Sequence, residues 1–165
     1  MTRPDGYVDL QVNGYAGVDF NREELTAEDL HRACEAMARD GAAAALPTII
    51  SDHIERMARR LARLVELRDA DPLVRRMTPG LHIEGPFLNE TDGYRGAHPL
   101  DAMQPASPDA MQRLLDAAGG LAKIVTLAPE RDPGLAVTRM LADRGIVVAA
   151  GHCDPTLDEL DAAID

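Results

Sequence analysis

The chain has 165 residues, about the size of one ordinary domain, and 45% of them are hydrophobic, so it can fold around a core. Its formal net charge is −11, and no lysine- or arginine-rich block occurs, which argues against nucleic acid and anionic membranes as partners. No apolar run reaches transmembrane length, and the cysteines, Cys34 and Cys153, lie far apart in the sequence; a reducing, cytoplasmic location is the expectation.

Strand-like and helix-like segments alternate along the whole chain. Five segments show the alternation or the short apolar run of a strand: residues 7–13, 42–50, 78–84, 122–127 and 146–150. Between and after them lie five helical patterns, expected over residues 25–40, from 51 to just before 72, from 107 onward, from 132 through 141, and from 154 to the end of the chain. Pro47 is a complication for an interior strand.

Several residues mark the helix boundaries. Thr26 and Ser51 are expected as N-caps, and Gly41 as the end of the first helix. Ser107–Pro108 combines a serine cap with a proline in the first turn.

Five consecutive βα units without hairpin signals predict parallel strands joined by right-handed helical crossovers. Polar residues then fall at the carboxyl ends of the strands, which is the catalytic face of an α/β barrel: Gln11, Asn13, Thr48, Glu84, Glu130 and His152. An open doubly wound sheet is disfavoured because no Gly-x-Gly-x-x-Gly turn follows the first strand. A complete barrel needs eight units and about 250 residues. The prediction is therefore an α/β fold, a partial TIM (β/α)8 barrel with about five βα units, in which residues 1–165 form an incomplete catalytic barrel domain.

Glu84 and His152 are the strongest pair of candidate metal ligands. Glu84 ends an alternating strand just before Gly85–Pro86, and His152 follows the last apolar run, so each is held on a rigid strand end. The alternatives are that Glu84 pairs with an arginine and that His152 caps the helix opening at Asp154. A catalytic zinc site has three protein ligands, so a third must come from another strand end or from outside these residues.

Two amides, Gln11 and Asn13, stand side by side at the end of the first strand. Many metal-dependent hydrolases on this barrel have two histidines at this position. Amides are poor zinc ligands, so Gln11 and Asn13 in their place indicate a site for one metal ion rather than two. The alternative is that this segment forms a turn, since Asn13 precedes a glycine. His98, in the long loop after Glu84, is a candidate to bind a sugar hydroxyl or phosphate, or else is exposed and idle. His82 shares the face of Glu84 but lies deeper, which favours a packed, hydrogen-bonded role.

Three further residues have simpler expected roles. Cys34 lies in a helical stripe and is expected in the core, and Cys153 is expected to point away from the metal face. Glu130 either binds substrate or caps the helix that follows it.

Ordered motifs across nearly the whole chain carry a resemblance to a known family. The chain resembles the N-acetylglucosamine-6-phosphate deacetylases of the amidohydrolase superfamily, in their amino-terminal part. The matching stretches are residues 9–14, 17–21, 82–89, 96–99, 125–130 and 151–152.

The resemblance implies a metal-dependent hydrolase that converts N-acetylglucosamine 6-phosphate to glucosamine 6-phosphate and acetate. Glu84 and His152 would bind one divalent metal ion, with zinc expected and iron or manganese as alternatives. Gln11 and Asn13 would lie near that metal and mark a single-metal subtype. Ala97 and His98 would contact the amino-sugar phosphate.

Other parts implied by the resemblance fall outside the chain. The general-base aspartate and the third metal ligand, a histidine, are expected beyond Asp165, and the remaining barrel strands and a small β-sandwich are absent. The 165 residues alone are therefore expected to be inactive, and the full-length enzyme is expected to be a homodimer. Two other functions stay open: a non-catalytic sugar-phosphate binding fragment, and another amidohydrolase acting on a cyclic amide or nucleobase.

Overall fold

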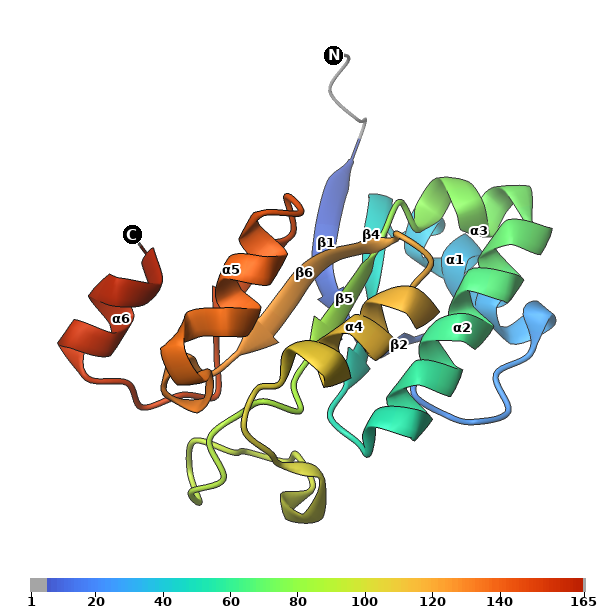
Figure 1. The fold of residues 1–165 in the computed structure, drawn as a ribbon. Coiled ribbons are helices and arrows are strands. Elements are labelled where there is room, and N and C mark those ends of the chain that lie inside the picture. The colour runs from blue at the N-terminus through green and yellow to red at the C-terminus, as the bar shows by residue number, and fades with distance from the viewer. Residues whose placement is uncertain (1–5, 165) are drawn as a thin grey trace.

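The computed structural model describes residues 6–164. Five strands form one parallel sheet in the order β1 (Tyr7–Val12), β4 (Ala42–Ile50), β5 (Leu81–Glu84), β6 (Ala122–Leu127) and β7 (Val147–Ala150). The sheet is curled, and its strands end toward the same side, the lower side in Figure 1. This is the predicted partial α/β barrel, because parallel strands curl together while the crossover helices stay on one face.

Within the described residues, six α-helices connect or follow these strands: α1 (Ala27–Arg39), α2 (Ile54–Ala70), α3 (Pro72–Met77), α4 (Pro108–Ala117), α5 (Ala136–Ala142) and α6 (Leu157–Ile164). The predicted caps of α1 and α4 are confirmed. The side chain of Thr26 accepts a hydrogen bond from the backbone N–H of Asp29, and that of Ser107 accepts one from Ala110. Helix α4 packs between α2 and α5, so the helices follow the order of the strands.

A small hairpin and one short α-helix were not predicted. A small antiparallel hairpin, β2 (Gly14–Tyr15) and β3 (Val18–Asp19), follows β1, so the expectation of no hairpins is wrong. The turn forms because Ala16 and Gly17 adopt positive φ angles of 50° and 79°. Helix α3 begins at Pro72, where Asp71 accepts hydrogen bonds from the backbone of the next turn.

Other expected boundaries differ. Ser51 does not cap α2, whose N-cap residue is His53; the Ser51 hydroxyl instead donates to the backbone carbonyl of Glu84, 3.1 Å away. The fourth predicted helix divides into a 3-10 turn, η3 (Pro133–Leu135), and α5, because Gly134 and Leu135 have positive φ. The last helix begins at Leu157 rather than at residue 154.

Pro47 lies inside β4 without breaking it. Its partner on β1 is Val12, and the register between the two strands is irregular just before this pair. The backbone N–H of Val12 donates to the hydroxyl of Thr48, 3.1 Å away. A side chain thus satisfies the Val12 donor beside the proline. The irregular register there is the kind of position, a bulge, in which strands accept proline.

The core lies between the sheet and the helices. Its centre is built from fully buried apolar side chains of β4, β5 and the first two helices, including Ile49, Ile83, Met57 and Leu61. Cys34 belongs to this core, as predicted. No helix among the described residues combines the length and the apolar character that a bilayer crossing needs.

Candidate metal centre

Glu84 is placed by the end of strand β5. Ile83 packs into the helix-facing core, so His82 and Glu84 on either side of it point together to the opposite, concave side of the sheet. Gly85 then turns the chain with a φ of +79°, a conformation that glycine adopts without strain. Glu84 is only 4% exposed although it ends its strand.

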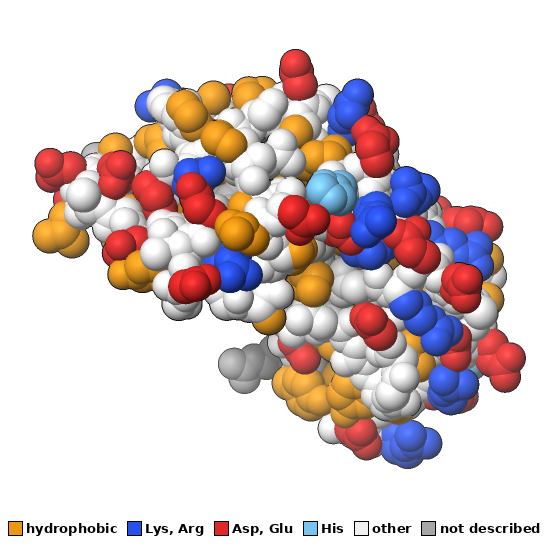
Figure 2. Space-filling view, turned by 90° about the horizontal axis from the view of Figure 1, so that it is seen from below, with side chains coloured by type: hydrophobic (Ala, Val, Ile, Leu, Met, Phe, Trp, Pro, Cys, Tyr) orange, Lys and Arg blue, Asp and Glu red, His pale blue; other side chains and the backbone are white. Residues whose placement is uncertain are grey.

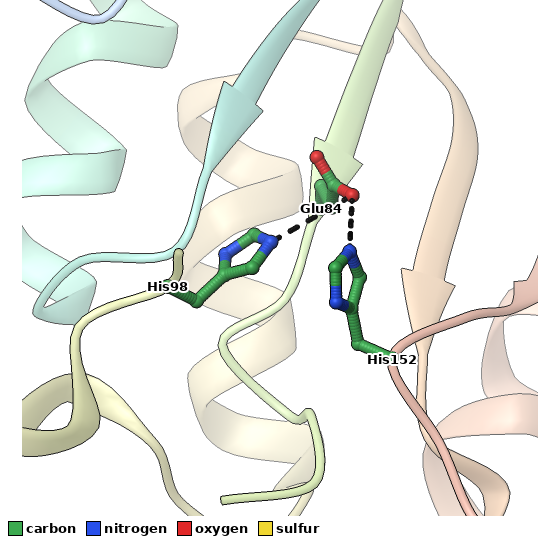
Figure 3. Close-up of side chains that lie close together, drawn as sticks. All are labelled: Glu84, His98 and His152. Atoms are coloured by element: carbon green, nitrogen blue, oxygen red, sulfur yellow. Dashed lines mark hydrogen bonds and ion pairs between the residues drawn. The ribbon is translucent and has the colours of Figure 1, made fainter. Parts of the chain in front are cut away.

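Two histidines from separate loops converge on this carboxylate (Figure 3). Nε2 of His152, in the loop after β7, lies 3.2 Å from Oε1 of Glu84, and Nε2 of His98, in the loop after β5, lies 3.8 Å from the same oxygen. The two rings meet edge to face with their centroids 4.4 Å apart. Candidate ligand atoms of all three residues lie within 4.8 Å of one another.

The orientation of His152 is set from behind the ring. Its Nδ1 lies 2.9 Å from the backbone carbonyl oxygen of Tyr94, and a carbonyl only accepts, so Nδ1 carries the proton. In the neutral ring, Nε2 then presents a lone pair to the Glu84 carboxylate. That contact is favourable only when His152 is protonated or when a cation lies between the two groups. A carbonyl behind the ring is also the usual partner of a metal-bound histidine.

The Glu84 carboxylate is stabilised as the anion. Burial by itself would raise its pKa, but the neighbouring His98 and His152 outweigh this effect and hold the pKa below its usual value. The side chain of Gln11 donates to Oε2 of Glu84 over 3.1 Å. Gln11 therefore occupies one carboxylate oxygen and leaves Oε1 to face the histidines.

A small cavity opens in front of the cluster. It has a volume of about 180 Å³ and is lined by the candidate substrate residues Ala97 and His98 together with Asn13, Ile50, Glu84 and His152. Pockets for small-molecule ligands are typically about 300–1,000 Å³, so this cavity is smaller than a typical ligand pocket. Figure 2 views the molecule from the side of the strand ends and shows acidic and basic side chains interspersed there.

His98 is buried in this cavity wall rather than idle at the surface. It is 6% exposed, and its Nδ1 has no hydrogen-bond partner among residues 6–164. The distance of 3.8 Å to Glu84 is too long for a hydrogen bond. The long loop thus brings His98 beside the carboxylate, a juxtaposition that its sequence position did not reveal.

His82 has the packed role that its depth predicted. Its Nδ1 donates to the carbonyl of Leu10 over 3.0 Å, and its Nε2 lies 2.7 Å from the hydroxyl of Thr126. Burial lowers its pKa, so the ring is neutral and Nε2 accepts from that hydroxyl. His82 therefore joins β1, β5 and β6 beneath the cluster.

Among the described residues, neither alternative to metal binding by Glu84 and His152 is found. The ionic neighbours of Glu84 are histidines, not an arginine. His152 does not cap α6, which starts five residues later.

Glu130 accepts hydrogen bonds from the side chain of Asn89 (2.9 Å) and from the backbone N–H of Asp154 (2.6 Å).

Comparisons with known proteins agree with the motifs. No family model matches the chain. The N-acetylglucosamine-6-phosphate deacetylase of Bos taurus is 33% identical over 165 residues, covering 96% of this chain and 39% of that protein. The human enzyme of the same name is 35% identical over 153 residues, covering 89% and 36%.

Solved structures match equally well. A variant of N-acetyl-D-glucosamine-6-phosphate deacetylase from Mycobacterium smegmatis, in complex with N-acetyl-D-glucosamine-6-phosphate, superposes with a TM-score of 0.86 at 32% identity, covering 98% of this chain and 40% of that one. The enzyme from Pasteurella multocida gives a TM-score of 0.81 at 30% identity, covering 97% and 40%. The chain spans about two fifths of the length of these relatives. The predicted resemblance is therefore confirmed: this chain is similar, over nearly its whole length, to part of the N-acetylglucosamine-6-phosphate deacetylases.

Proposed function

We propose that this chain supplies the metal-binding part of a hydrolase that removes the acetyl group from N-acetylglucosamine 6-phosphate, releasing acetate and glucosamine 6-phosphate. The observation that carries the proposal is the pairing of Nε2 of His152 with the buried carboxylate of Glu84 while Nδ1 is committed to a carbonyl. The substrate and the reaction are those for which the similar proteins are named.

The residues fit a divalent cation. Coordination bonds from zinc to histidine nitrogen and to carboxylate oxygen are each about 2.0–2.2 Å long, so one ion can bridge atoms up to about 4.2 Å apart. The separation of 3.2 Å between Glu84 and His152 lies within that limit. Glu84 and His152 are the proposed ligands, and a bound cation would supply Lewis-acid polarisation of the substrate's amide carbonyl. Zinc is the proposed ion, and the nitrogen–oxygen donor set also suits iron and manganese.

The other residues have orienting and binding roles in this proposal. Gln11 holds the Glu84 carboxylate by its second oxygen, and the Tyr94 carbonyl keeps Nε2 of His152 directed inward. Asn13, a neutral amide on the cavity wall, agrees with a single metal ion. Ala97 and His98 are the proposed contacts of the amino-sugar phosphate, supported by their place in the wall. The proton transfers of amide hydrolysis belong in this proposal to an aspartate beyond Asp165.

Acetate release by the full-length product of the gene tests the function. With N-acetylglucosamine 6-phosphate and its galactosamine epimer offered in parallel, we expect metal-dependent release from the glucosamine derivative. His152→Ala should lose both turnover and bound metal, measured by elemental analysis. His53→Ala, a change of an exposed histidine at the start of α2, serves as the control and should change neither.

Other results would favour the alternatives. Binding of the sugar phosphate without hydrolysis would favour a binding fragment, and turnover of a cyclic amide in its place would favour another amidohydrolase. The 165-residue chain alone should be inactive.

A cytoplasmic location and a homodimeric full-length enzyme complete the proposal. Cell fractionation tests the location, and light scattering of the purified protein tests the oligomeric state.

A further inference from the structure

We propose that Glu130 is a positioning residue that holds His152 in its ligand orientation. The inference rests on the proposed metal centre. Glu130 is not part of the cavity beside Glu84, His98 and His152; it hydrogen-bonds to Asn89 and to the backbone of Asp154, just after His152. Figure 3 shows the orientation of His152 toward Glu84 that these contacts would hold.

The contacts form a closed ring of three hydrogen bonds. The carbonyl of His152 accepts from the backbone N–H of Asn89 over 2.9 Å, and the side chain of Asn89 donates to Oε1 of Glu130 over 2.9 Å. The same Oε1 accepts from the backbone N–H of Asp154, two residues past His152, over 2.6 Å. The carbonyl of His152 and the N–H of Asp154, both just after the Cα that carries the imidazole, are therefore tied to one carboxylate oxygen, the carbonyl through Asn89.

His152 needs such a support. It lies between β7 and α6 in a segment without regular structure, and its φ of +50° is a conformation that non-glycine residues seldom adopt. Residues held there persist only when surrounding contacts impose the conformation. Relaxation of this backbone would move Nε2 away from Glu84, 3.2 Å distant.

Glu130 is itself well anchored. It lies in the 3-10 turn η2 (Pro129–Arg131), and Ala128, which joins this turn to β6, donates its backbone N–H to the carbonyl of Phe87 over 2.8 Å. Its second oxygen, Oε2, is buried and has no partner among the described residues. Burying a carboxylate is costly unless its hydrogen bonds compensate. In this protein those bonds are directed to Asn89 and Asp154, which favours a role in holding the His152 loop.

Metal affinity of the full-length product, measured with zinc against a chromophoric chelator, tests the inference. Glu130→Ala removes two hydrogen bonds and should weaken zinc binding by about 10- to 100-fold, the usual effect of losing a residue that supports a metal ligand. Glu130→Gln keeps an accepting oxygen and should bind zinc nearly as the wild type does. Asn89→Ala removes the side-chain bond to Glu130, together with the bond that Oδ1 of Asn89 accepts from the backbone N–H of Thr91. It leaves the bond from Asp154 to Glu130 in place and should weaken zinc binding less than Glu130→Ala.

The control is Glu90→Gln, which alters an exposed ion pair with Arg131 in the same region and should leave zinc affinity unchanged. Wild-type affinity in Glu130→Ala would overturn the inference. Equal losses in Glu130→Gln and Glu130→Ala would overturn it too, because they would show that the charge matters and the accepting oxygen does not. If Glu130→Ala no longer melts cooperatively, it is unfolded and its zinc affinity says nothing about positioning. The zinc affinities of Asn89→Ala and Glu90→Gln are then compared, and equal values would overturn the inference. Full zinc affinity in His152→Ala would instead refute the proposed metal centre, a result that none of the Glu130 outcomes resembles.

Discussion

The substitution Glu84→Gln separates metal binding from folding at this site. In the metal-free protein, a glutamine amide can direct its oxygen toward the donating side chain of Gln11 and its NH₂ group toward the lone pair on Nε2 of His152. The variant therefore satisfies both neighbours without a cation. We expect its free energy of unfolding, without metal, to stay within about 1 kcal/mol of the wild type.

The effect on metal binding should be far larger. Structural zinc sites with four protein ligands bind with about 10–16 kcal/mol, or about 2.5–4 kcal/mol for each ligand. Since about 1.4 kcal/mol changes an equilibrium constant tenfold, the loss of one ligand should weaken binding by roughly 60- to 700-fold. Elemental analysis and chelator competition measure this directly, and thermal unfolding in the presence of a chelator measures the stability.

Two results would refute this reasoning. Unchanged zinc content in Glu84→Gln would show that this carboxylate is not a ligand. A large loss of stability without metal would show that the charge of Glu84 supports the fold, contrary to the hydrogen bonds expected of the amide.

Further predictions concern residues outside the metal centre. His82→Phe leaves the buried hydroxyl of Thr126 and the part-buried carbonyl of Leu10 without their partner, so it should destabilise the protein by about 1–4 kcal/mol in chemical denaturation, and an unchanged free energy of unfolding would contradict this. Burial raises the pKa of Cys34 to about 12, so a thiol reagent should modify the half-buried Cys153 first; mass spectrometry showing equal rates would argue against it. The hydrogen bond between His31 and Asp71 raises the pKa of His31 and lowers the pKa of Asp71. The pair should therefore stabilise the fold most at pH values between these two pKa values. Its contribution should disappear as pH rises through the raised pKa of His31 or falls through the lowered pKa of Asp71. Because His31 is partly exposed, His31→Gln should cost at most about 1 kcal/mol in that window and nothing at alkaline pH; a difference that persists there would contradict the assignment.

Local signals in the sequence were sufficient for most elements. The strand at residues 122–127 and the capped start of α4 at Ser107–Pro108 agree with the prediction, because apolar alternation and cap chemistry act over a few residues. Helix α3 had a usable signal that the prediction did not apply: Asp71–Pro72 has the same cap-and-proline pattern as Ser107–Pro108. The role of Ser51 could not be predicted from its neighbours in the sequence, because its hydroxyl donates to a backbone carbonyl of another strand.

The candidate metal centre likewise has parts that the sequence predicted and parts that it did not. Alternation along residues 81–84 placed Glu84 and His82 on one face, and the apolar run before Gly151 placed His152 at a strand end. Their convergence followed from the rule that parallel strands end on one side. The contact between His98 and Glu84 did not follow, because a long loop without regular structure has no periodicity from which to predict its path.

The order of apolar and polar residues was thus enough to determine a parallel, barrel-like sheet with a carboxylate and an imidazole at the same edge, after two strands that β6 separates. Only the tertiary structure decided which nitrogen of His152 faces Glu84, and that Glu130 and Asn89 hold the loop that carries it. The physical reason is the distance along the chain over which the deciding interactions act. Strand and helix patterns arise from neighbours in the chain, whereas the direction of a side chain in a loop depends on hydrogen bonds to residues 24 to 68 positions away.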